Sequence, residues 1–138
     1  MAILRPDASL QRFLDNLTAV NGTLHNASLA IYTSNHTPVA ADVAGTYTAI
    51  EASFGGYARQ TITDWAASTV TGHIAKSVAG NYTFTATGTG LPVTIYGVFV
   101  LDGGGNLLYA ELIPTGGVTL TAAGHAFTYN PQWTDQNA

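Results

Sequence analysis

Cysteine is absent from this 138-residue sequence, which excludes disulfide bonds and thiolate chemistry. Charge is scarce as well: charged residues make up 9% of the chain, against about 25% in ordinary globular domains. Only four residues are basic, and nucleic-acid binding needs a stripe of cations to neutralise phosphates. We therefore expect no nucleic-acid partner.

Long hydrophobic runs are also missing. No segment approaches the roughly 20 apolar residues that a membrane-spanning helix needs. The N-terminal residues MAILRPDASL lack the apolar core of a secretion signal, because Arg5, Pro6 and Asp7 interrupt it. We expect a protein that has no membrane partner and is not exported by the general route.

The low charge has a second consequence, since charged surfaces help to keep proteins soluble and monomeric. Two interpretations remain open. The chain is either an ordinary neutral β protein or a subunit whose surface lies against other subunits. The second interpretation predicts a homo-oligomer.

Apolar residues recur at helical spacing near the N-terminus, and the series comprises Leu10, Phe13, Leu14, Leu17 and Val20. With Asn21-Gly22 as a stop signal, this pattern predicts a helix over residues 8–20.

After Gly22 the apolar period changes to two, which is typical of strands. The alternation is clear at 29–33, 82–87, 118–122 and 127–129, and further strands are expected at 45–50, 57–63 and 68–75. Turn signals rich in glycine, asparagine and proline separate these runs. We predict an all-β fold, an antiparallel β-sandwich or jelly roll with one short N-terminal helix. It would form a single domain over 1–138, with a helical segment at 1–22 and a C-terminal tail at 130–138.

The longest apolar run is IYGVFVLDGGGNLLYAEL, and Asp102-Gly103-Gly104-Gly105-Asn106 interrupts it. A phosphate-binding loop would lead into a helix, and an EF-hand loop would end in a distal glutamate. Neither pattern follows, so we predict a β-hairpin turn. The arms are apolar at successive positions, which indicates burial on both faces, one of them by another layer or subunit. Our candidate interface residues are Tyr96, Val98, Val100, Leu108 and, as an anchor of the tail, Trp133.

Signals of catalysis or metal binding are weak. The histidines, His25, His36, His73 and His125, form no closely spaced ligand pair, although a non-local cluster stays open. No Gly-x-Ser-x-Gly elbow is present. Glu51, Asp64 and Glu111 lie near aromatics or in apolar runs, so one of them could have a raised pKa, but facing carboxylates are not visible in a sequence. We predict no catalytic residue, no cofactor and no metal, and hence no enzyme.

Two segments resemble a pattern in small virion proteins of tailed bacteriophages. They are TYTAIEASFGGYARQTITDW and IYGVFVLDGGGNLLYAEL, and the matching residues are Gly56, Tyr57, Ala58, Ile62, Tyr96, Gly97, Tyr109, Ala110 and Glu111. The resemblance runs from about Leu24 to Trp133. It implies a non-enzymatic structural subunit, such as a capsid decoration (cement) protein, and it supplies no catalytic residue.

The same resemblance implies a location and partners. The protein would be made in the bacterial host cytoplasm and reside on the virion, on the capsid surface, in the head–tail region or in the tail. Its partners would be further copies of itself and other virion proteins, among them the major capsid protein.

A different class of function stays open beside this one. A carbohydrate-binding adhesin, or a tail- or fibre-associated module, would use exposed aromatics and the polar loops at 34–42 and 88–92. The candidates for stacking on a sugar are Trp65, Tyr82, Phe84 and Trp133, although alternating aromatics on a strand are more often core residues.

Overall fold

The computed structural model describes residues 7–19 and 22–136. Within these ranges most of the regular structure is β-strand in antiparallel sheets, with a short N-terminal helix, which confirms the predicted all-β class. The finer assignment to a sandwich or jelly roll stays a prediction. Neither described helix is long and apolar enough to cross a membrane.

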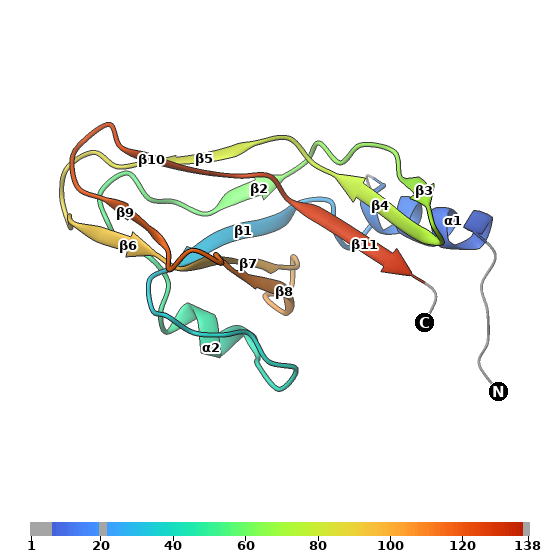
Figure 1. Ribbon diagram of the computed structural model, residues 1–138, viewed down its shortest axis with the longest axis horizontal. Helices are drawn as coiled ribbons and strands as arrows, with labels where there is room; N and C mark the ends of the chain where they lie inside the picture. Colours follow the sequence, from blue (N-terminus) through green and yellow to red (C-terminus); the bar gives the residue numbers. More distant parts are fainter. Residues whose placement is uncertain (1–6, 20–21, 137–138) are drawn as a thin grey trace. The chain divides into compact units, whose positions relative to one another are not determined.

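The chain forms two compact units. Unit 1 comprises Met1–Asn26, Ile62–Asn81 and Asn130–Ala138, and unit 2 comprises Ala27–Thr61 and Tyr82–Tyr129. The described elements, labelled in Figure 1, are α1 (Asp7–Thr18), β1 (Ala27–Tyr32), α2 (Ala44–Thr48), β2 (Gln60–Ile62), β3 (Thr69–Thr71), β4 (Ile74–Val78), β5 (Tyr82–Thr85), β6 (Val93–Ile95), β7 (Gly97–Leu101), β8 (Leu107–Leu112), β9 (Val118–Leu120), β10 (Ala126–Tyr129) and β11 (Gln132–Gln136).

Unit 1 combines α1 with a three-stranded sheet in the order β11-β4-β3. The helix that periodicity predicts at 8–20 is α1, with Leu14 fully buried. Ser68 joins the helix to the segment before β3, because its hydroxyl and its N–H both donate to Oδ1 of Asp15, at 2.7 and 2.9 Å.

The prediction of one strand at 68–75 is wrong, because this segment contains a turn between β3 and β4. Thr71 pairs with Ile74, so Gly72 and His73 alone form the loop. Both residues have positive φ, 58° and 64°, as a type I′ hairpin requires. The segment assigned to the C-terminal tail also contains a strand, β11, which pairs with β4 along its length.

Unit 2 is built on a four-stranded sheet in the order β2-β1-β7-β8, with the separate pairs β5–β10 and β6–β9. All five residues of β7 are buried. The strand expected at 57–63 is the shorter β2. In Figure 1, α2 and the β5–β10 pair lie on opposite sides of β1 and β7. The burial predicted for both faces of β7 is therefore present within this single chain.

The prediction of a strand at 45–50 is wrong, because Ala44–Thr48 forms α2. The alternation of Thr46 and Thr48 around Tyr47 imitates a strand, yet Ala44, Tyr47 and Ile50 all contact one core cluster, at the spacing of a helical face. Tyr47 lies 5.2 Å from Tyr32 and 5.5 Å from Phe99, measured between ring centroids. Burial of this ring favours the helix over the local strand pattern.

On the opposite face, Tyr57, Phe84 and Phe127 form a stack. The ring centroids of Tyr57 and Phe84 are 5.8 Å apart, and those of Phe84 and Phe127 are 6.5 Å apart. The hydroxyl of Tyr57 accepts a hydrogen bond from the N–H of Ile31 at 3.4 Å, which ties the stack to β1.

The glycine-rich segment is the turn of the β7–β8 hairpin, as predicted. Oδ1 of Asp102 accepts hydrogen bonds from the N–H groups of Gly104 and Asn106, both at 2.9 Å. The donors of the loop are thus directed at its own carboxylate, an arrangement typical of aspartate in turns.

We expect Gly97→Ala to destabilise the fold, because a Cβ at this position would meet the ring of Tyr32 and the carbonyl oxygen of Glu111. The expected loss is about 1–3 kcal/mol of unfolding free energy, which urea denaturation measures. Gly103→Ala is the matched control, since a Cβ there meets nothing within 4 Å. Equal stability of the two variants would contradict this packing.

Candidate functional site

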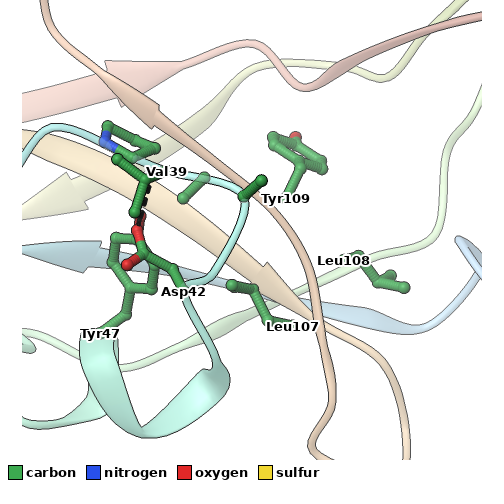
Figure 2. Close-up of a pocket in the computed structure, with 9 residues that line it drawn as sticks. Val39, Asp42, Tyr47, Leu107, Leu108 and Tyr109 are labelled. Carbon is green, nitrogen blue, oxygen red and sulfur yellow. Dashed lines mark hydrogen bonds between the residues drawn. The ribbon is translucent and has the colours of Figure 1, made fainter.

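A groove in unit 2 runs between β8 and the loop at 38–43 with the start of α2 (Figure 2). Its first part has a volume of about 390 Å³, and a second part of about 380 Å³ shares Asp42 and Leu107 with the first. The first part is lined by Pro38, Val39, Ala40, Asp42, Tyr47, Leu107, Leu108, Tyr109 and Ala110. The second adds Val43, Ala44, Gly45 and Asn106.

The groove follows the edge of β8 rather than one face. Four successive residues, Leu107 to Ala110, line it, whereas alternate side chains of a strand point to opposite faces. β8 is also the last strand of its sheet. Between β7 and β8, Val100 pairs with Tyr109 and Leu101 pairs with Leu107, which leaves Leu108 as the extra residue of a β-bulge.

Asp42 holds the loop that forms the other wall. Its Oδ2 accepts three hydrogen bonds: from the N–H of Val39 at 2.9 Å, from Nε2 of His36 at 2.8 Å and from the hydroxyl of Tyr47 at 2.7 Å. Because Tyr47 belongs to the core cluster, this carboxylate connects the exposed loop to the interior.

These donors stabilise the charged form of the carboxylate. The backbone N–H of Val39, followed by His36 and Tyr47, lowers the pKa of Asp42 to about 2. Burial and the neighbouring carboxylate raise the pKa of the Tyr47 hydroxyl above its ordinary value. At neutral pH the loop is therefore held by an ionised aspartate and a neutral tyrosine.

Two valines of the loop are exposed to an unusual degree. Val39 has 58% and Val43 has 63% of its surface exposed, the largest values among the large apolar residues that the structure describes. The N–H of Val39 is bound to Asp42, and the N–H of Val43 donates to Oγ1 of Thr46 at 3.2 Å. Local hydrogen bonds thus support the backbone from which both side chains project.

The groove contains the carboxylate of Asp42. Among the lining residues that the structure describes, none is a lysine or an arginine. Asn106, in the second part, donates its N–H to Asp102, and this bond, with others from the turn, holds the pKa of that carboxyl below its usual range. Asp42 and Asp102 are consequently both ionised at neutral pH.

A second polar cluster in unit 2 is structural. Oε1 of Glu51 accepts from the Tyr57 hydroxyl at 2.6 Å and from Nε of Arg59 at 2.8 Å, and a second Arg59 nitrogen donates to Oε2 at 2.7 Å. Although burial alone would raise it, the hydrogen bonds from Arg59 and Tyr57 hold the pKa of Glu51 below its ordinary value. The raised pKa considered for this carboxylate is wrong, because it has a cationic partner.

The five candidate interface residues differ in their burial and in their surroundings. Val98 and Val100 are 1% and 0% exposed, so they contact this chain's own core and offer no surface to a partner. Tyr96 is half-buried and packs against the core cluster. Trp133 is half-buried on β11 of unit 1. Leu108 alone lines the groove.

The other candidates from the sequence are dispersed. Among the described residues, no group of three or more His, Asp or Glu side chains is placed to hold a metal ion. Of the aromatics considered for a sugar platform, Phe84 is 1% exposed, and Trp65 donates its Nε1–H to the carbonyl oxygen of Leu24 at 2.8 Å.

Comparison with known proteins adds no relative: no family model, curated protein or solved structure matches this chain. Fold and site together define an all-β protein of antiparallel sheets with a groove at a sheet edge, lined by apolar side chains and by the carboxylate of Asp42.

A loop at 34–42 is predicted from the sequence, but as a polar loop of the carbohydrate-binding alternative and not as the apolar wall of a groove. Its signal is the run Pro38-Val39-Ala40-Ala41-Asp42-Val43-Ala44, which is apolar except at Asp42 yet lies among turn signals. A run of this kind outside any strand suggests an exposed apolar surface.

We expect the stability that Asp42 provides to be lost in acid. Its pKa is depressed in the folded state, so its contribution is present above the unfolded value and falls between about pH 4 and pH 2. The melting temperature of Asp42→Asn should lie below that of the wild type at neutral pH, and the difference should shrink across this window. A difference independent of pH would contradict the hydrogen-bonding scheme.

Proposed function

We propose that this protein is a non-enzymatic structural subunit of a bacteriophage virion, a capsid decoration or cement protein that acts as a homo-oligomer. The observation that carries the proposal is the exposed apolar loop at 38–43 beside the edge strand β8. A protein that stabilises a shell needs such a surface, because subunits joined through it separate only when its contacts also break.

The physical properties of the loop support this role. Apolar area removed from water contributes about 25 cal/mol per Å², and residues already held in place lose little entropy on binding. Val39 and Val43 project from a backbone that hydrogen bonds hold. The charged fraction of 9% agrees with a surface that partners cover.

The segments that resemble small virion proteins also build the groove and its support. Tyr109 and Ala110 line the groove. Gly97 lies beneath the ring of Tyr32, which packs against Tyr47. Tyr57 reaches Glu51 on the opposite side of the sheet. Four of the nine motif residues therefore have structural roles in unit 2.

Purified virions of the phage that encodes this chain test the proposal. Quantitative mass spectrometry should find the protein at many copies per particle, and particles lacking it should release their genome at a lower temperature. Absence from washed particles, or unchanged heat resistance after its removal, would overturn the cement role.

We expect the purified protein to be larger than a monomer in dilute solution. Light scattering after gel filtration measures the molar mass directly, and the monomer mass from the sequence is 14.3 kDa. A monomeric mass at all concentrations would contradict the proposed homo-oligomer.

A further inference from the structure

We propose that the groove binds an extended segment of another virion subunit, in which apolar residues alternate with lysine or arginine, as an added strand at the free edge of β8. The source of the segment rests on the proposed function. The chemistry of the segment rests on the groove alone.

The edge position of β8 requires an extended segment. No strand lies beside its outer edge in the part of the chain that the structure describes, and a strand edge presents a row of backbone donors and acceptors. A peptide in strand conformation satisfies these groups, a mode of recognition known as β-augmentation. Because successive residues of β8 line the groove, its space extends along this edge.

The side chains of the groove determine which residues the segment carries. Val39 and Ala40 from the loop and Leu107, Leu108 and Ala110 of β8 line the same space of about 390 Å³. Figure 2 shows Val39 and Leu107 on the two walls. Apolar side chains of the segment fill this space and cover the exposed valines.

The charge of the groove determines the sign of the segment's polar residues. All three hydrogen bonds to Asp42 converge on Oδ2, so its Oδ1 receives none from the described residues. Asp102 provides a second anion at the turn next to Asn106. The described lining residues include no lysine or arginine, so lysine or arginine in the segment complements these carboxylates, whereas glutamate would be repelled.

The probe is a fluorescein-labelled peptide of this chemistry, acetyl-SVKVTVKVG-amide, and its control replaces both lysines with glutamate. Fluorescence anisotropy with the full chain should show saturable binding of the lysine peptide. The affinity should fall as sodium chloride rises from about 0.05 M to about 0.5 M. The glutamate peptide should bind at least about tenfold more weakly.

Variants of the groove identify the site. Val39→Lys and Val43→Lys change exposed side chains, so folding is preserved, and each should weaken binding at least about tenfold. Ile74→Lys is the matched control, because Ile74 is an exposed apolar residue of unit 1 with 39% of its surface accessible, and it should leave binding unchanged.

Three results would overturn the proposal: no saturable binding of the lysine peptide, equal binding of the glutamate peptide, or full affinity in both valine variants. A fourth is dissociation of the homo-oligomer by Val39→Lys and Val43→Lys, which would assign the groove to a second copy of the chain. Each leaves the cement role intact, because virion content and heat resistance test that role separately.

Discussion

The packing of Tyr32 over Gly97, with Tyr47 and Phe99 beside it, is the constraint on which the described part of unit 2 depends. It joins β1, β7 and α2 in one cluster that water does not reach. Because the Tyr32 ring occupies the space where a Cβ of residue 97 would lie, only glycine allows β7 to pass beneath it. The buried ring also raises the pKa of the Tyr32 hydroxyl to about 12, through burial and then the nearby carboxylates Asp42 and Glu111, so the cluster stays neutral.

Two hydrogen bonds join this cluster to the surface loop, and in one of them the hydroxyl of Tyr32 donates to the carbonyl oxygen of His36 at 3.1 Å. The hydroxyl of Tyr47 reaches Asp42 at 2.7 Å, and Asp42 in turn holds His36 and the backbone of Val39. The conformation of the loop therefore depends on its own hydrogen bonds to Asp42 and on the buried ring to which Asp42 is joined. An exposed loop of small apolar residues would otherwise have little to hold it in one conformation. Here it forms a wall with a definite shape.

Two features of the edge strand β8 affect its pairing with strands of other chains. Natural sheets protect exposed edges by bulges, charges or coverage, because an unprotected edge pairs with other chains. β8 has a bulge at Leu108 and a carboxylate at Glu111, which accepts a hydrogen bond from Tyr129 at 2.6 Å. These features limit indiscriminate pairing, and because Leu108 lines the groove, a segment added there has to accommodate the bulge.

The sequence by itself determined the elements that periodicity and turn chemistry encode locally: α1, the β7–β8 hairpin, its Asp-Gly-Gly-Gly-Asn turn and the all-β class. It did not determine α2, because the strand-like alternation around Tyr47 yields to the burial of one ring. Nor could it show that β7 is covered on both faces by its own chain, since that depends on residues distant in sequence. The groove belongs to the same group: Asp42 and Leu107 are 65 positions apart, and only tertiary packing brings them to one site.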